Sequence, residues 1–168
     1  MVTGAPGAGK STLALPLAER LGWPLLSKDH IKETLFDAMG GVGDSLTESR
    51  RFGAGAMGTL WALAARCPQA VLEANFRPRS DYEQERLVGL GAEVVEVYCA
   101  CPLPEAMRRF KARGAAGVHP AHPWRLMDDD TFAEFDRPMG VGHLITVDTT
   151  RPTDIDAIAA EVARSFPL

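Results

Sequence analysis

The sequence has no long hydrophobic run. Its longest apolar stretch, around residues 94–101, is interrupted by Glu96 and falls far short of the roughly 20 apolar residues that a membrane-spanning helix needs. It also has no excess of basic residues, because 18 Lys and Arg residues stand against 22 Asp and Glu residues and leave a net charge of −4. We therefore expect no membrane segment and no general affinity for nucleic acid.

Cysteine is scarce as well. The three residues Cys67, Cys99 and Cys101 are an odd number without the spacing of a zinc site, which argues against a disulfide framework and against a structural metal. A glycine-rich motif begins at residue 4, so we expect no signal peptide before it. Together these features predict a reduced, cytoplasmic protein.

Internal repeats and low-complexity linkers are also missing. A chain of 168 residues, 46% of them apolar and 24% charged, predicts a single domain over residues 1–168. Short apolar strands alternate with helices, which predicts an α/β fold with a five-stranded parallel sheet covered on both faces. The expected strands are residues 2–3, 24–27, 70–74, 93–99 and 144–147. The expected helices are residues 10–21, 29–39, 47–66, 81–90, 104–113 and 153–166, with a helical turn at 131–135.

What the sequence does have is a phosphate-binding motif. GAPGAGKS fits the pattern G-x-x-x-x-G-K-[ST] at Gly4, Gly9, Lys10 and Ser11, between a strand and a helix. Glycine lets several backbone N–H groups point at one phosphate, because it has no side chain in the way and tolerates positive φ. Lys10 would bind the β- and γ-phosphates, and the Ser11 hydroxyl would hold Mg²⁺. The predicted ATP-binding residues of the motif are Gly4, Ala5, Pro6, Gly7, Ala8, Gly9, Lys10, Ser11 and Thr12.

A nucleotide site alone does not name a reaction. The sequence has no N-K-x-D motif, with which a switch GTPase reads its base. ABC and AAA+ ATPases are expected to carry further signature segments and to have longer chains. One short domain with a phosphate-binding loop therefore favours a kinase that acts on small molecules.

Two carboxylates are predicted at strand ends, where open parallel sheets bind their ligands. Asp29 follows the second strand and Glu73 ends the third. Phosphoryl transfer to an alcohol uses one carboxylate to accept the hydroxyl proton and another to help hold the metal. We assign the first role to Asp29 and the second to Glu73, although the opposite assignment also fits. Asp29 has a structural alternative as the N-cap of the next helix.

A basic helix precedes a loop rich in Gly, Pro and His. AMRRFKARG places Arg109 and Arg113 four residues apart, on one helix face. We expect a lid over about residues 108–127, whose arginines stabilise charge on the transferring phosphoryl group and exclude water. The alternative is a helix C-terminus with cations that complement its dipole. His119 and His122 are expected to be surface residues of the loop, because no other metal ligand lies near them.

The acceptor is expected to bind between the helical region of about residues 30–66 and the residues after the third strand. Lys32, one helical turn after the proposed base, is either an acceptor contact or a solvated lysine. Asn75 would bind an acceptor hydroxyl, Phe76 would wall the pocket and Arg77 would hold an anionic group, since loop residues at the active edge of a sheet are often functional. These residues and Lys32 are the predicted substrate contacts.

The chain resembles the P-loop kinases of the zeta-toxin, polynucleotide-kinase and chloramphenicol-phosphotransferase type in the segments GAPGAGKST, SKDHIKETL, VLEANFRPRSD, VYCACPLPEAMRRFKARG and ITVDTTRP. The resemblance implies a nucleoside-monophosphate-kinase-like fold with the strand order 2-3-1-4-5. It also implies that Asp29 acts as the base. Lys32 stands where relatives usually carry arginine, and Glu73 stands where an aspartate is more usual.

The same resemblance implies that Arg109 and Arg113 face the ATP phosphates. It further implies that the turn with Arg151 packs on the adenine base. The sequence therefore predicts an ATP- and Mg²⁺-dependent enzyme that moves the γ-phosphoryl group to a hydroxyl of a small molecule. Two alternatives stay open, namely a nucleotide or polynucleotide 5'-hydroxyl kinase and an ATP-binding regulator without transfer chemistry.

Overall fold

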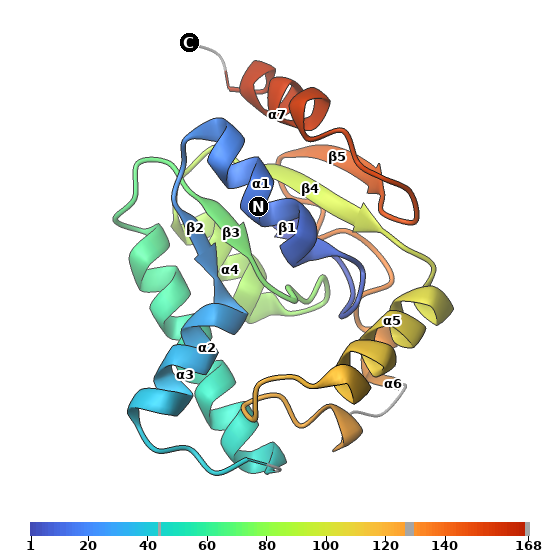
Figure 1. Cartoon of the computed structure of the whole chain (residues 1–168). Helices are drawn as coiled ribbons and strands as arrows, with labels where there is room; N and C mark the ends of the chain where they lie inside the picture. Colours follow the sequence, from blue (N-terminus) through green and yellow to red (C-terminus); the bar gives the residue numbers. More distant parts are fainter. Residues whose placement is uncertain (44, 127–129, 167–168) are drawn as a thin grey trace.

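A computed structural model describes residues 1–43, 45–126 and 130–166 of the chain. Its centre is a sheet of five parallel strands in the order β2-β3-β1-β4-β5 (Figure 1). The predicted fold class and strand order are confirmed. The strands are β1 (Val2–Thr3), β2 (Leu25–Ser27), β3 (Val71–Glu73), β4 (Val95–Ala100) and β5 (His143–Asp148).

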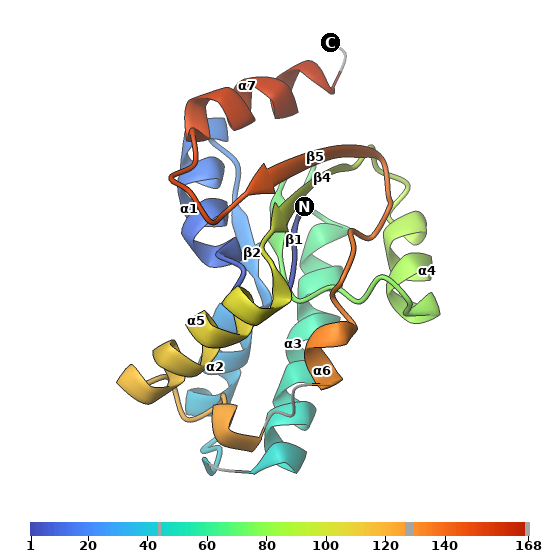
Figure 2. The ribbon, with the colours of Figure 1, turned by 90° about the vertical axis from the view of Figure 1, so that its right-hand side faces the viewer.

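Helices cover both faces of the sheet, as Figures 1 and 2 show. On one face, α1 (Lys10–Leu21) and α7 (Ile155–Arg164) share an apolar core with the strands. On the other face, α3 (Leu46–Ala64) and α4 (Asp81–Gly89) share a second core with β3. Burial on both faces explains why the strands are short apolar runs without strict alternation.

The remaining helices lie toward the carboxyl ends of the strands (Figure 1). They are α2 (Lys28–Ala38), α5 (Leu103–Ala116), α6 (Asp130–Ala133) and the 3₁₀ turn η1 (Trp124–Leu126). Helix α5 runs three residues past the predicted end at residue 113. Within the described ranges, no helix is both long and apolar enough to cross a membrane.

The register of the sheet brings the candidate residues to one edge. In the parallel ladders, Glu73 of β3 is aligned with Ser27 of β2 and with Val2 of β1. The glycine loop begins directly after β1, at Gly4. Because parallel strands end at the same edge, the glycine loop, Glu73 and the start of α2 meet there.

A buried carboxylate in β4 fastens the chain segment that leads into β5. Glu96 is fully buried, and it accepts hydrogen bonds from Thr3 Oγ1 at 2.6 Å, from the Met139 amide at 2.7 Å and from the Gly140 amide at 2.9 Å. A buried carboxylate needs such donors, because an unpaired one is costly to remove from water. Glu96 interrupts an apolar run in the sequence, but in the fold it holds the sheet and this segment together.

Candidate active site

The glycine loop lies between β1 and α1 and packs closely on its surroundings. Gly4, Gly7 and Gly9 have φ angles of 134°, 80° and 90°, which side-chain-bearing residues rarely adopt. A Cβ atom at Gly4 would stand 2.9 Å from the Cys99 carbonyl oxygen, and one at Gly7 would overlap the Ala106 carbonyl oxygen. The loop therefore lies against β4 and α5 with space only for glycine at these two points.

Lys10 lies over the glycine loop. It is 6% exposed, and its Nζ donates a hydrogen bond to the Ala5 carbonyl oxygen at 2.8 Å. Burial lowers the pKa of Lys10, and the negative charges of Glu73 and Asp29 oppose that shift. A desolvated ammonium group beside a glycine loop and a helix N-terminus suits a phosphate group.

Glu73 connects the first turn of α1 with the end of β2. The residue is 2% exposed, and its carboxylate accepts hydrogen bonds from Ser11 Oγ at 3.1 Å and from Ser27 Oγ at 2.6 Å. Hydroxyl and carboxylate oxygens are ligands that Mg²⁺ accepts, and this ion usually takes only one or two of them from the protein. Among the described residues, no group of three or more His, Cys, Asp and Glu side chains is placed to hold a metal ion. The donor set therefore fits Mg²⁺ that also binds phosphate oxygens and water.

Asp29 lies in the first turn of α2, and its charge interacts with that of Lys10 in the glycine loop. Its Oδ1 lies 3.1 Å from Lys28 Nζ. Burial alone would raise the pKa of Asp29, but Lys28, His122 and Lys10 hold it well below the usual range of an aspartate. The N-cap of α2 is Ser27, whose hydroxyl accepts from the His30 amide, so the capping alternative for Asp29 is wrong. An ionised carboxylate within the field of Lys10 can accept a proton from a bound alcohol.

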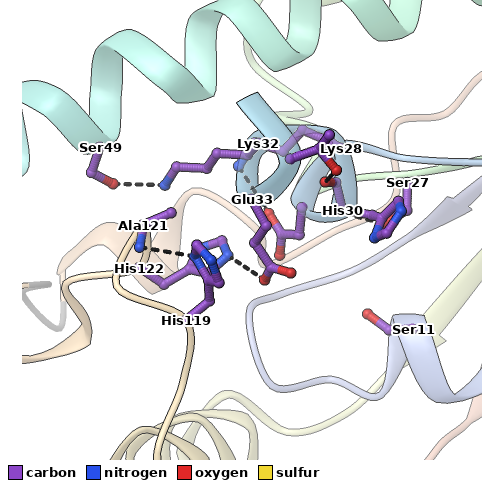
Figure 3. Close-up of polar contacts among 12 residues, drawn as sticks. Ser11, Ser27, Lys28, His30, Lys32, Glu33, Ser49, His119, Ala121 and His122 are labelled. Carbon is purple, nitrogen blue, oxygen red and sulfur yellow. Dashed lines mark hydrogen bonds and ion pairs between the residues drawn. The ribbon is translucent and has the colours of Figure 1, made fainter. Parts of the chain in front are cut away.

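The loop after α5 is attached to α2 through its two histidines (Figure 3). His122 Nε2 lies 2.9 Å from Glu33 Oε1, and His119 Nε2 lies 3.1 Å from Asp37 Oδ1. The Ala121 amide donates to His119 Nδ1 at 3.2 Å. Each histidine is partly buried and has an acidic partner on α2, so both hold the loop to this helix. The loop thereby brings an imidazole to within electrostatic reach of the candidate base.

Lys32 extends from α2 to α3. It is 5% exposed, and its Nζ donates to Ser49 Oγ at 2.7 Å (Figure 3). Burial lowers the pKa of Lys32 to about 8, with a further lowering by Lys28. Lys32 is therefore not the solvated helix lysine of the structural alternative, and it links the two helices of the predicted acceptor region.

The two arginines of α5 reach different parts of the site. Arg109 binds Glu105 Oε1 at 2.7 Å and donates to the Thr149 carbonyl oxygen at 3.0 Å, so it connects α5 with the turn after β5. Arg113 is exposed, and its charge contributes to the lowered pKa of Lys10. Both cations therefore lie near the glycine loop, on the side of the site opposite α2 (Figure 1).

The residues after β3 divide between core and surface. Phe76 is 1% exposed and packs against Trp61 of α3, with 5.6 Å between the ring centroids. It belongs to the core beneath α3 and does not form the pocket wall that the sequence suggested. Asn75, the preceding residue, is partly buried.

Two predicted cationic contacts are paired on the surface. Arg77 Nε lies 2.9 Å from Glu134 Oε2, and both side chains are more than half exposed. Arg151 Nε lies 3.4 Å from Asp148 Oδ2 in the turn after β5, with 82% of the arginine side chain exposed. Exposed pairs of this kind are weak, so each arginine is free to exchange its partner for a ligand.

The Phe76→Leu variant separates a core role from a substrate contact. Loss of aromatic packing against Trp61 is expected to lower the free energy of unfolding by about 1–2 kcal/mol, while the KM for the acceptor stays unchanged. Urea denaturation and steady-state kinetics measure the two quantities. A raised KM with unchanged stability would contradict the core assignment.

Several residues of the site were missed in the sequence. Ser27 could have been identified from the sequence, because a serine two residues before an acidic residue at the start of a helix is typical of an N-cap. Glu33 lies four residues after Asp29 and thus on the same helix face. Its contact with the loop, like that of Asp37, has no local signal, since their histidine partners lie more than 80 residues away.

The chain is similar to one known protein family and to several proteins of known structure. The chain matches the AAA domain family AAA_33 over residues 1–129, and no curated protein matches it. A solved protein from Chloroflexus aurantiacus, described as a putative kinase, is 32% identical with a TM-score of 0.82, over 99% of this chain and 96% of that chain. The APS kinase of Mycobacterium tuberculosis in complex with AMPPNP and APS is 21% identical, with a TM-score of 0.58 over 98% and 94% of the two chains. The shikimate kinase from Acinetobacter baumannii in complex with shikimate is 20% identical, with a TM-score of 0.53 over 97% and 89%.

Proposed function

The chain belongs to the AAA domain family AAA_33, and from this premise we propose that it transfers the γ-phosphoryl group of ATP to a hydroxyl group of a small molecule. The observation that carries the proposal is the position of Asp29, an ionised carboxylate in the first turn of α2, directly after β2, that interacts electrostatically with Lys10 of the glycine loop. The APS kinase and the shikimate kinase share the fold, which supports the reaction class by analogy alone.

In the proposed reaction, Asp29 accepts the proton of the acceptor hydroxyl while the hydroxyl oxygen attacks the γ-phosphorus. The bond from the γ-phosphorus to the bridging β,γ-oxygen breaks, ADP leaves, and Asp29 releases the proton to solvent. Lys10, Arg109 and Arg113 stabilise the negative charge of the transferring group. The turn with Arg151 would contact the adenine base.

Mg²⁺, when bound, would supply charge neutralisation at the β- and γ-phosphates. Ser11 Oγ and the Glu73 carboxylate would hold it, since they lie 3.1 Å apart at the end of the glycine loop. Ser27 orients the same carboxylate through its second oxygen, which is the kind of outer support that metal-binding carboxylates require.

A nucleotide or polynucleotide 5'-hydroxyl kinase has weaker support. Such an enzyme needs cations that are available to the phosphates of its acceptor. Of the described cations beside the site, Lys32 is buried against α3, and only Arg77 and Arg79, in exposed pairs with Glu134 and Asp136, could turn to such phosphates. We also propose that the chain is related to the kinases of the zeta-toxin and chloramphenicol-phosphotransferase type, and this proposal rests on the sequence segments alone.

The proposal is tested with labelled ATP and a panel of alcohols. The protein is incubated with [γ-³²P]ATP, Mg²⁺ and sugars, cyclitols, nucleosides, alcohol-bearing antibiotics and oligonucleotides with a free 5'-hydroxyl. We expect label on a small alcohol and loss of that label when EDTA removes Mg²⁺. Binding of ATP without label on any acceptor and without slow hydrolysis would favour the regulator. Preferential labelling of oligonucleotides would favour the polynucleotide kinase.

A further inference from the structure

The groups that α2 and the loop after α5 present beside Asp29 have a consistent chemistry. Asp29 and Glu33 are four residues apart on one helix face, and His122 of the loop contacts Glu33. Their side chains are 37%, 36% and 22% exposed, whereas that of Lys28 is 17% exposed and Lys32 is a buried residue. An acceptor beside the candidate base therefore meets two carboxylates and one imidazole, and the base itself is paired with Lys28.

The two lysines of α2 near these groups each have a partner. Lys28 Nζ binds Asp29 Oδ1 at 3.1 Å, and Lys32 Nζ reaches Ser49 Oγ on α3 (Figure 3). Burial lowers the pKa of His122, and the neighbouring charges of Asp29 and Glu33 oppose that shift. An anionic group on the acceptor would meet the Glu33 carboxylate, while the two nearby lysines are bound to Asp29 and Ser49.

Contacts of its other residues hold the loop after α5, and with it His122, in place. Ala121 is fully buried in a cluster with Phe36 of α2 and Phe52 of α3. Because His119 Nδ1 accepts from the Ala121 amide, the proton of this ring is on Nε2, which donates to Asp37. His119 and the buried alanine thus position the neighbouring His122 against Glu33.

On the basis of the proposed function, we propose that the acceptor is an uncharged polyol, one hydroxyl of which faces Asp29 while a second donates to Glu33. His122 contacts Oε1 of Glu33. Because a carboxylate accepts several hydrogen bonds, Oε2 of Glu33 can accept one from a hydroxyl of the phosphoryl acceptor. Carboxylates accept from hydroxyl groups and repel phosphates, and Glu33 thereby selects for hydrogen-bond donors and against anions. Specificity of this kind needs the repulsive element as well as the attractive one.

Matched acceptor pairs test the inference. Transfer from [γ-³²P]ATP is measured to myo-inositol, D-ribose and adenosine, each beside its own monophosphate. We expect an uncharged compound to be phosphorylated with a kcat/KM about tenfold or more above that of its monophosphate. The Glu33→Gln variant is expected to raise the KM for this acceptor about tenfold with little change in kcat. Glu33→Lys is expected to reverse the preference toward the monophosphate, which a purely structural residue would not do.

The outcomes distinguish this inference from the function on which it rests. Glu85→Gln, at an exposed position of α4, is the matched control and should leave both constants unchanged. If the monophosphates are the better acceptors, or if Glu33→Gln leaves the KM unchanged, the polyol inference is overturned and the kinase proposal stands. If ATP binds and no compound of this set or of the wider panel is phosphorylated, both are overturned.

Discussion

The Asp29→Asn variant is expected to lose most of its phosphoryl transfer, with kcat lowered by about 10²- to 10⁴-fold, the usual contribution of a general base. Asparagine has nearly the same shape but cannot accept the hydroxyl proton. The ATP phosphates are expected to bind on the glycine loop and Lys10, so the affinity for ATP should stay unchanged. Single-turnover kinetics with the best acceptor and a binding titration with an ATP analogue measure the two quantities.

A control and a contrasting variant make this prediction decisive. Asp81→Asn, at the exposed first residue of α4, removes a charge of the same kind and should leave kcat unchanged. If Glu73 were the base and Asp29 the metal partner, Glu73→Gln would abolish transfer at saturating Mg²⁺, and Asp29→Asn would only raise the Mg²⁺ concentration required. Full activity of the Asp29→Asn variant would mean that Asp29 takes no part in the reaction.

The features that sequence predicted well are those with a local or periodic cause. The glycine loop was predictable because its function needs glycine at fixed spacing, and the structure explains Gly4 and Gly7 through positive φ and close backbone contacts. Strand order followed from the family resemblance. The placement of Asp29 and Glu73 at one edge needed only the rule that parallel strands end together.

The features that sequence missed depend on contacts between distant segments. The bond of His122 to Glu33 joins residues 89 positions apart, and that of Ser27 to Glu73 joins residues 46 positions apart. Phe76 follows a strand at the active edge, and only the path of α3 above it decides that its ring is buried. Lys32 looked solvated or substrate-binding because the sequence does not show that α3 lies beside it. Tertiary packing decides such cases, and local pattern does not.

The Gly7→Ala variant is expected to unfold more easily and to bind ATP poorly. Alanine at the φ of 80° seen at Gly7 costs about 1–2 kcal/mol, and the overlap of its Cβ with the α5 backbone at Ala106 costs about 1–3 kcal/mol more. We therefore expect the free energy of unfolding to fall by about 2–5 kcal/mol. The added methyl group also pushes α5 from the loop, and α5 carries Arg109 and Arg113, so affinity for ATP should fall as well.

Gly58→Ala is the matched control for this variant. Gly58 lies in the interior of α3, and a Cβ there would have no neighbour within 4 Å, so the same substitution should raise the free energy of unfolding by about 0.5–1 kcal/mol. Urea denaturation of both variants, with and without ATP, measures stability and nucleotide binding in one experiment. Opposite signs for the two glycines would follow from the packing of the loop on α5. If Gly7→Ala were as stable as the wild type, the glycine loop and α5 would not be in contact at this point. If it also bound ATP as well as the wild type, the positions of Arg109 and Arg113 would not depend on this contact.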